Sequence, residues 1–315
     1  MPPCDAHRPP LHGSGVTRCG ARGNYLSGAA ACLYAGRMDE VDVLVVGAGQ
    51  MGRGIAQVCL EADCRVALAD TQPGSLARAR DELMTGASSV ASRLRTVNWP
   101  SAEPLQARIA IEAGPEDFAI KAEIFCELDR LLGEEAWLAS NTSSISITAL
   151  AANVRAPERV LGLHFMNPVP KMRLVEIIRG LQTSDAAIAA GRALTDKLAK
   201  VSVLTKDAPA FLVNRMLVPL VLEAFFLLEQ GQATPEDIDT AVKLGLNHPM
   251  GPLTLADFVG LDTLLAISEV LMRDLGDDKY RAPVLLRHYV SAGWLGRKAG
   301  RGVYRYDAQG KQVRT

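Results

Sequence analysis

From residue 38 onward, short apolar stretches alternate with longer amphipathic ones. Residues 43–46 are all aliphatic, and the next stretch carries apolar side chains at Ile55, Val58 and Ala62, which is the spacing of one helix face. A second apolar stretch then ends at Asp70. The pattern predicts a strand, a helix and a second strand, which together form a βαβ unit.

The same alternation continues to about residue 205 and predicts a larger sheet. The stretch RLVEII, rich in β-branched residues, is typical of a strand buried on both faces of a parallel sheet. Further strands are predicted at residues 107–114, 136–140, 159–165 and 173–178, with helical patterns at 75–95 and 115–132. The fold class is therefore expected to be α/β, with a Rossmann-like doubly wound sheet over residues 38–205. Ligands should bind beyond the carboxyl ends of its strands.

Glycines mark the turn between the first predicted strand and helix. Gly47, Gly49 and Gly52 form a GxGxxG motif, which permits a tight turn and a close approach of the backbone to a pyrophosphate. Asp70, at the end of the second strand, is placed to accept hydrogen bonds from a ribose hydroxyl and would repel a 2′-phosphate. The motif predicts a dinucleotide site that prefers NAD to NADP.

One charged residue stands inside the apolar stretch RLVEII. Glu176 is flanked by Leu174, Val175, Ile177 and Ile178, and a buried carboxylate needs a partner.

We expect that partner to be His164, because it lies 12 residues earlier in the preceding strand, and the connection NPVPKM joins the two. The carboxylate would then fix the tautomer of an imidazole that acts as a general base. An inert structural pair is the alternative interpretation. The nearby dinucleotide motif and the polar loop of Ser140 to Ser144 favour catalysis.

Composition narrows the classes of function. The 315 residues are 48% hydrophobic and 22% charged with a net charge of −1, so a large core is expected but no basic surface for nucleic acid. Six cysteines show no zinc-site spacing, so we expect no metal and a reducing compartment, the cytoplasm. The most apolar stretch, residues 217–228, is shorter than the roughly 20 residues of a membrane span, so no membrane partner is expected.

Residues 1–37 differ from the rest of the chain. They contain four Arg, one acidic residue and clustered Pro and Gly, which predicts a disordered extension. Two origins stay open. The segment is either an organelle transit peptide, which would make the protein mitochondrial, or a stretch upstream of a true start at Met38.

Seven blocks of the sequence resemble, in order, those of the L-3-hydroxyacyl-CoA dehydrogenases, especially the short-chain 3-hydroxybutyryl-CoA type. They are GAGQMGRGIAQ, IEAGPEDFAIKAEIF, SNTSSISIT, GLHFMNPVPKMRLVEII, KDAPAFLVNR, HPMGPLTLADFVGLDT and GRKAGRGVYRY. The resemblance implies that His164 is the catalytic base, that Glu176 orients it, and that Ser143 and Asn214 contact the substrate. It implies NAD binding by Gly47, Gly49, Gln50, Met51, Gly52, Asp70, Glu116, Lys121, Ser143, Asn167 and Lys298.

Five of these residues also have a purely structural interpretation. Ser143 can cap the loop after its strand, and Asn214 can be a satisfied polar group between helices. Glu116 can be an acid in the first turn of a helix. Lys121 and Lys298 can be solvated surface charges. Only the matches to the family favour the functional roles.

The C-terminal part, residues 206–315, is expected to be an all-helical domain. A helix is predicted at 209–230, and Thr234 and Gly245 are expected to cap and end the next one. The apolar face of FLVNRMLVPLVLEAFFLL is broader than one neighbouring helix needs. With the family's dimer-forming helical module as a guide, we expect residues 206–315 to bind substrate and form a homodimer.

Two departures from the family stand out. The chain is short between Asp70 and Glu116, where relatives have a helical hairpin over the CoA moiety. Ser88, Arg93 and Arg95 are left as candidates to meet the substrate's phosphate. Ala210 also replaces a frequent glycine.

The expected function is reversible, NAD-dependent oxidation of a short-chain L-3-hydroxyacyl-CoA. The alternatives are oxidation of a small non-CoA 3-hydroxy acid, sugar acid or carnitine-like alcohol, and a non-catalytic NAD-binding scaffold.

Overall fold

The computed structural model describes residues 41–84, 92–102 and 104–313. The predicted extension at 1–37 and the candidate residue Ser88 lie outside the described residues.

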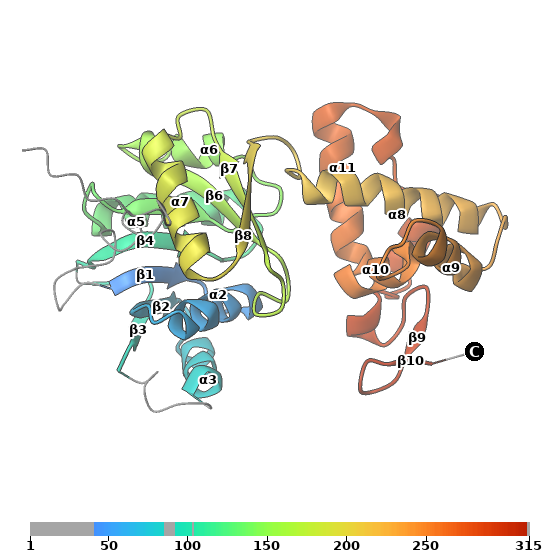
Figure 1. The fold of residues 1–315 in the computed structure, drawn as a ribbon, viewed down its shortest axis with the longest axis horizontal. Helices are drawn as coiled ribbons and strands as arrows, with labels where there is room; N and C mark the ends of the chain where they lie inside the picture. Colours follow the sequence, from blue (N-terminus) through green and yellow to red (C-terminus); the bar gives the residue numbers. More distant parts are fainter. Residues whose placement is uncertain (1–40, 85–91, 103, 314–315) are drawn as a thin grey trace, which may run out of the picture. The chain divides into compact units, whose positions relative to one another are not determined.

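An eight-stranded sheet forms the N-terminal part of the described chain (Figure 1). Its spatial order is β3-β2-β1-β4-β5-β6-β7-β8, and every neighbouring pair is parallel except β6 and β7. The strands are β1 Val41–Val46, β2 Val66–Asp70, β3 Leu94–Asn98, β4 Ala107–Glu112, β5 Trp137–Ser140, β6 Val160–Phe165, β7 Leu174–Arg179 and β8 Val201–Lys206. The order confirms the expected Rossmann-like sheet.

The sequence-based prediction was wrong in three places. The stretch RLVEII forms β7, which pairs antiparallel with β6 because only a short connection joins them, and parallel only with β8. The helical pattern at 75–95 ends early, since α3 covers Pro73–Met84 and β3 begins at Leu94. The edge strands β3 and β8 were not predicted.

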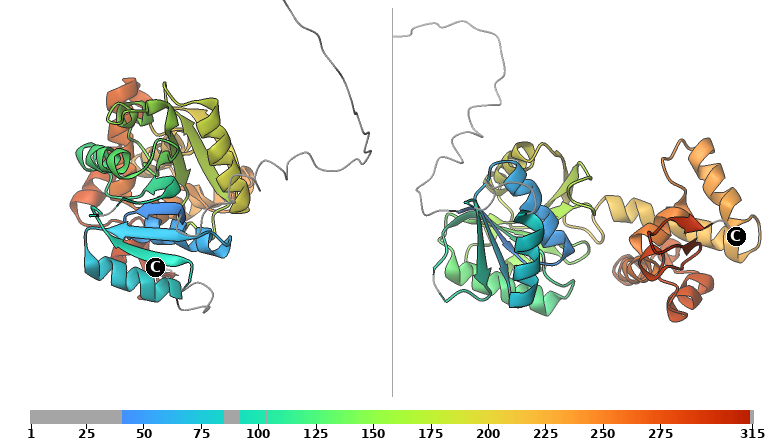
Figure 2. Two further views of the ribbon diagram at one scale, coloured as in Figure 1. Left: turned by 90° about the vertical axis from the view of Figure 1, so that its left-hand side faces the viewer. Right: turned by 90° about the horizontal axis from the view of Figure 1, so that it is seen from below.

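Helices cover both faces of the sheet (Figure 2). One face carries α5, Phe118–Leu131, and α6, Ile147–Ala151, whose apolar side chains share a buried cluster with alternate residues of the strands. The other face carries α2, Gln50–Glu61, and α7, Asp185–Lys197, where Gly191 lies close to Leu161 and Ile177. The two helical layers bury the central strands from both sides.

The glycine turn between β1 and α2 depends on two close approaches. Gly47 has a φ of 112°, and a Cβ at Gly52 would lie 1.7 Å from the carbonyl oxygen of Gly47. No side chain larger than hydrogen fits at Gly52, so the start of α2 is held against the end of β1.

The C-terminal part is a helical cluster with its own buried core. Its helices are α8 Val213–Glu229, α9 Pro235–Gly245, α10 Pro252–Val259, α11 Leu261–Leu275 and α12 Val284–Ser291, followed by a small hairpin of β9 Arg305–Tyr306 and β10 Gln312–Val313. Thr234 caps α9 by accepting a bond from the amide of Asp237, as predicted. The helix predicted at 209–230 begins at Val213 instead.

Two buried aspartates tie the C-terminal segment to this cluster. Asp257 accepts bonds from the amides of Val303 and Tyr304 and from the hydroxyl of Tyr306. Asp239 accepts bonds from the amide of Leu253 and the hydroxyl of Tyr304. These bonds satisfy the two carboxylates without a cation. Among the described helices, none is long and apolar enough to cross a membrane.

Candidate active site

His164 and Glu176 face each other across the antiparallel pair of β6 and β7. The register pairs the two residues directly, so their side chains leave the same face of the sheet. Nδ1 of His164 lies 2.7 Å from Oε2 of Glu176, and both side chains are buried. The contact expected from the sequence is therefore present.

The second carboxylate oxygen of Glu176 binds the start of helix α8. Oε1 accepts hydrogen bonds from the backbone amides of Leu212, at 3.0 Å, and Val213, at 2.9 Å. Burial raises the pKa of Glu176, but the bond with His164 and these two amides outweigh it, so the pKa is lowered and the carboxylate stays ionised. Glu176 thus serves both the imidazole and the helix that carries Asn214.

A strained turn presents those two amides. Ala210 and Phe211 have φ values of 58° and 52°, in the left-handed region that favours glycine. The ring of Phe211 lies 5.7 Å from the imidazole of His164, centroid to centroid. Phe211 was not among the predicted site residues, although its position inside the KDAPAFLVNR block was a usable signal.

The other imidazole nitrogen meets Ser143. Nε2 of His164 lies 3.0 Å from Oγ of Ser143. When Nδ1 donates its proton to the ionised Glu176, Nε2 carries a lone pair and accepts a bond from a hydroxyl. This tautomer leaves Nε2 ready to take a proton from a hydroxyl at the site.

Glu116 holds the loop that carries Ser143. Its Oε1 accepts bonds from the hydroxyl of Thr142, at 2.6 Å, from the amide of Ser143, at 2.9 Å, and from the amide and hydroxyl of Ser144, both at 3.0 Å. Burial raises the pKa of Glu116, but the nearby Lys121 ammonium and these bonds outweigh it and lower the pKa. Glu116 lies just before the helix cap Asp117 and so joins α5 to the loop.

Lys121 lies inside the protein and not on its surface. Its Nζ is 2.8 and 2.9 Å from the two carboxylate oxygens of Glu112 and 3.4 Å from Oε2 of Glu116. Lys121 is 1% exposed and Glu112 is fully buried. The solvated-charge interpretation of Lys121 is therefore wrong. Glu112 was missed, although an acid at the carboxyl end of an apolar strand was visible in the sequence.

The glycine turn and the β6–β7 connection meet at the nucleotide end of the site. Oδ2 of Asp70 accepts a bond from the amide of Ala48 at 2.6 Å, and Nε2 of Gln50 donates to Oδ1 of Asn167 at 3.1 Å. The N-cap of α2 is Gly49, which supplies no side-chain cap, and a Cβ there would point into open space. Open amides at a helix start and a carboxylate beside them fit a dinucleotide.

Three predicted residues have other positions or partners than the His164–Glu176 pair. Arg93 precedes β3 at the amino edge of the sheet and pairs with Asp63 at 2.6 Å. Lys298 pairs with Asp262 at 2.7 Å within the helical cluster. Asn214 is the second residue of α8 and is partly exposed.

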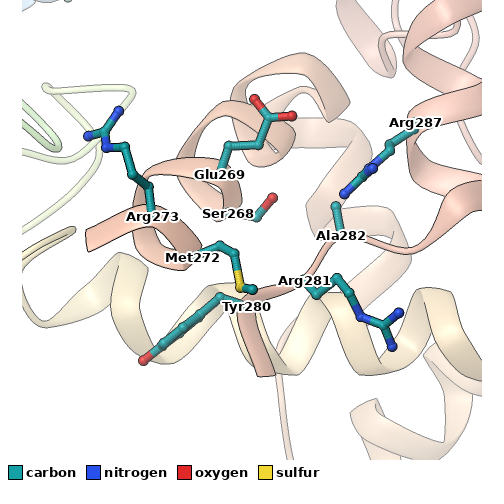
Figure 3. Close-up of a pocket in the computed structure, with 8 residues that line it drawn as sticks. All are labelled: Ser268, Glu269, Met272, Arg273, Tyr280, Arg281, Ala282 and Arg287. Carbon is teal, nitrogen blue, oxygen red and sulfur yellow. The ribbon is translucent and has the colours of Figure 1, made fainter. Parts of the chain in front are cut away.

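A cavity of about 190 Å³ lies elsewhere, between α11, α12 and the short 3-10 helix Asp278–Tyr280 (Figure 3). The guanidinium groups of Arg273 and Arg281 point away from each other there. The cavity contains none of the residues expected to act on substrate. Within the described ranges, no group of three His, Cys, Asp or Glu residues is arranged to hold a metal ion.

Comparison with known proteins gives a consistent result. Residues 42–208 match the NAD-binding domain of 3-hydroxyacyl-CoA dehydrogenase, and residues 211–306 match its C-terminal domain. The chain is 47% identical over 284 residues to a probable 3-hydroxybutyryl-CoA dehydrogenase of Bacillus subtilis, covering 86% of this chain and 99% of the relative. It is 47% identical over 275 residues to 3-hydroxybutyryl-CoA dehydrogenase of Bradyrhizobium diazoefficiens, covering 83% and 94%.

A solved structure agrees with these matches. The crystal structure of (S)-3-hydroxybutyryl-CoA dehydrogenase from Ralstonia eutropha matches with a TM-score of 0.79 and 43% identity, covering 85% of this chain and 99% of that one. The sheet, the glycine turn, the His164–Glu176 pair and both domain matches lead to one conclusion: the chain belongs to the 3-hydroxyacyl-CoA dehydrogenase family.

Proposed function

We propose that this protein catalyses the reversible, NAD-dependent oxidation of a short-chain L-3-hydroxyacyl-CoA to the 3-ketoacyl-CoA. The observation that carries the proposal is the continuous chain of contacts from Ser143 through His164 to Glu176. It supplies a hydroxyl contact, a base and a buried counter-charge in one line. Relatives at 47% identity, named for 3-hydroxybutyryl-CoA, support the substrate class.

His164 is proposed to move the proton. Its Nε2 takes the proton of the substrate's 3-hydroxyl. Nδ1 keeps its own proton and donates it in a hydrogen bond to Glu176, so the imidazolium forms beside an ionised carboxylate. NAD, when bound, accepts the hydride that leaves C3. In the reverse direction, the imidazolium returns the proton to the carbonyl oxygen.

Ser143 and Asn214 are proposed to orient the substrate oxygen. Ser143 already contacts Nε2 at 3.0 Å, so its hydroxyl marks where a substrate hydroxyl would be received. Asn214 lies one residue after Val213, whose amide is fixed by Glu176. Positioning by rigid neighbours of this kind supplies much of the rate gain of an enzyme.

The cofactor is proposed to lie along the glycine turn. The open amides at the start of α2 would receive the pyrophosphate, and Asp70 would receive a ribose hydroxyl. The remaining proposed contacts are Gln50, Met51, Glu116, Lys121, Ser143, Asn167 and Lys298.

A substrate panel tests the proposal. Purified protein should oxidise NADH, followed by the loss of NADH absorbance, with acetoacetyl-CoA as the acceptor and much more slowly with acetoacetate at equal concentration. Faster turnover of the free acid would reassign the protein to the small 3-hydroxy acids. NADH binding without turnover of either would favour a non-catalytic scaffold. The His164→Gln variant controls for contaminating activity.

We also propose that the helical part, residues 206–315, joins two copies of the chain. Met216 on α8 and Leu244 on α9 are 71% and 80% exposed, and a second copy of the chain would remove these large apolar side chains from water. Light scattering should then give twice the chain mass of 33.7 kDa. A Met216→Lys variant that still has the dimer mass would remove Met216 from the interface.

The cytoplasm is the compartment we propose. Cys59, Cys64 and Cys126 are free thiols in the described part of the chain, which supports a reducing environment. Cell fractionation tests this, and recovery in mitochondria would point to residues 1–37 as a transit peptide.

A further inference from the structure

A second buried charge cluster lies on the same face and edge of the sheet as the His164–Glu176 pair. Glu112 ends β4, Ser140 ends β5 and Lys121 reaches them from α5. Removing an unpaired ion from water is costly, and the proton transfer described above uses neither Glu112 nor Lys121.

We propose that Glu112 and Lys121 are positioning residues that hold Glu116 and the 142–144 loop, and thereby aim the Ser143 hydroxyl at His164. The proposal rests on the proposed function for the reaction that it supports. It gives Glu112 a function in the site, and it gives Lys121 a function in holding Glu116 and the loop.

One route of contacts runs through Lys121. Its ammonium lies 3.4 Å from Oε2 of Glu116, and Oε1 of the same carboxylate accepts the amides of Ser143 and Ser144. The cation keeps negative charge on the oxygens that hold the loop, since nearby opposite charges favour the ionised form. A protonated Glu116 would accept hydrogen bonds more weakly and would release the amide of Ser143.

A second route runs through Glu112. Its Oε2 accepts the hydroxyl of Ser140 at 2.6 Å, and the oxygen of that hydroxyl accepts the amide of Thr142 at 3.1 Å. Its Oε1 accepts the amide of Gly114 at 2.6 Å. Both routes end at the 142–144 loop, so the cluster fixes it from two directions.

The ammonium of Lys121 is shared by Glu112 and Glu116, so removing Lys121 and removing the charge of Glu112 should shift the pKa of Glu116 in opposite directions. Lys121→Met removes the cation from Glu116, so Glu116 takes up a proton at higher pH. Glu112→Gln leaves Lys121 with Glu116 alone, so Glu116 takes up a proton at lower pH. His164 and Glu176 beside the loop, and Asp207, which accepts bonds from Ser146 and Thr148 directly after it, are unchanged in both variants.

The measurement is the pH dependence of kcat for acetoacetyl-CoA reduction at saturating NADH. We expect the acid limb to move up by about one pH unit in Lys121→Met and down by a smaller amount in Glu112→Gln. We also expect kcat of Lys121→Met to fall about 10- to 100-fold relative to the unaltered protein at pH values below the shifted limb, where Glu116 is protonated and the loop is misplaced. The double variant Glu112→Gln/Lys121→Met removes both buried charges, should recover the fold, and should keep the upward shift.

A readout without turnover separates this proposal from the proposed function. The hydrogen-exchange protection factors of the Ser143 and Ser144 amides, which are corrected for the intrinsic pH dependence of exchange, should fall in Lys121→Met as the pH falls, while those of the unaltered protein stay high. If the unaltered protein turns over no acetoacetyl-CoA, the proposed function fails, and the exchange result still decides the role of the cluster.

Arg159→Met is the matched control. Arg159 forms a buried ion pair with Asp129, a residue of the same helix α5 as Lys121. The Arg159→Met variant should lose stability, but the acid limb of its kcat against pH should not move. Unmoved limbs and unchanged amide exchange in all the cluster variants would overturn the proposal in favour of a structural role. A raised NADH dissociation constant with an unmoved limb and unchanged amide exchange would also overturn it and leave Lys121 with its proposed cofactor contact alone.

Discussion

Both the sheet part and the helical part bury carboxylates, and the two parts satisfy them with different partners. In the sheet part, Glu176 meets an imidazole and Glu112 meets an ammonium. In the helical part, Asp239 and Asp257 meet amides and hydroxyls. The same cost of burial is therefore offset by titratable or cationic groups in one region and by neutral donors in the other.

The effect on ionisation follows from the partners. The pKa of Glu176 is lowered, because its hydrogen bonds outweigh the burial that raises it. The pKa of Asp257 is raised, because burial dominates over the bonds from Tyr304, Val303 and Tyr306. A carboxylate that must stay charged beside a moving proton needs the first arrangement, whereas one that only fastens a segment can use the second.

Glu176→Gln should give the largest effect. The Gln carbonyl can still accept the amides of Leu212 and Val213, so the fold should survive. Its amide group, however, donates to Nδ1 of His164, which moves the imidazole proton to Nε2 and leaves no lone pair for the substrate. We expect kcat to fall about 10²- to 10⁴-fold, measured by steady-state kinetics with acetoacetyl-CoA. Unchanged turnover would falsify the role assigned to Glu176.

Asp257→Asn should affect stability rather than chemistry. One Asn oxygen cannot replace the two that accept Val303, Tyr304 and Tyr306, and its NH₂ group would face a donor. We expect a loss of about 1–3 kcal/mol in the free energy of unfolding and a kcat within a factor of about two where the protein is folded. Urea unfolding and steady-state kinetics check both. A kcat loss as large as that of Glu176→Gln would end the distinction between the two regions.

The sequence predicted the parts of the fold that have a clear hydrophobic period. The βαβ unit, most of the central strands and the cap of α9 follow from local patterns in single segments. Strands β3 and β8 were missed because they lie at the sheet edges and are partly exposed, so their pattern is weak. The direction of β7 depended on the short connection after β6, a tertiary feature that its own composition does not reveal.

The contacts of the candidate site also divide into those that local sequence patterns predict and those that depend on tertiary structure. The His164–Glu176 contact was predictable because a lone acid in an apolar strand requires a partner. The bonds from Glu176 to α8 were not, because they arise from the left-handed turn at Ala210 and Phe211. Lys121 looked like a surface charge because its burial depends on Glu112, which lies in a different element.

The pH dependence of stability gives the smallest effect and compares the two regions most directly. Glu176 has a lowered pKa in the folded protein, so its contribution to stability is complete above its ordinary pKa and is lost as the pH falls through the lowered value.

Asp257 has a raised pKa, so the folded protein holds its proton more tightly than the unfolded chain. Its contribution therefore declines as the pH rises from its ordinary pKa to the raised one. The stability cost of Glu176→Gln should grow with pH up to the ordinary pKa of Glu176 and then stay level, whereas that of Asp257→Asn should shrink as the pH rises above the ordinary pKa of Asp257. Urea unfolding of both variants beside the unaltered protein measures the two slopes. If the stability costs of the two variants changed with pH in the same direction, neutral amides and hydroxyls would stabilise an ionised carboxylate as well as an imidazole does. The two regions would then differ only in their geometry.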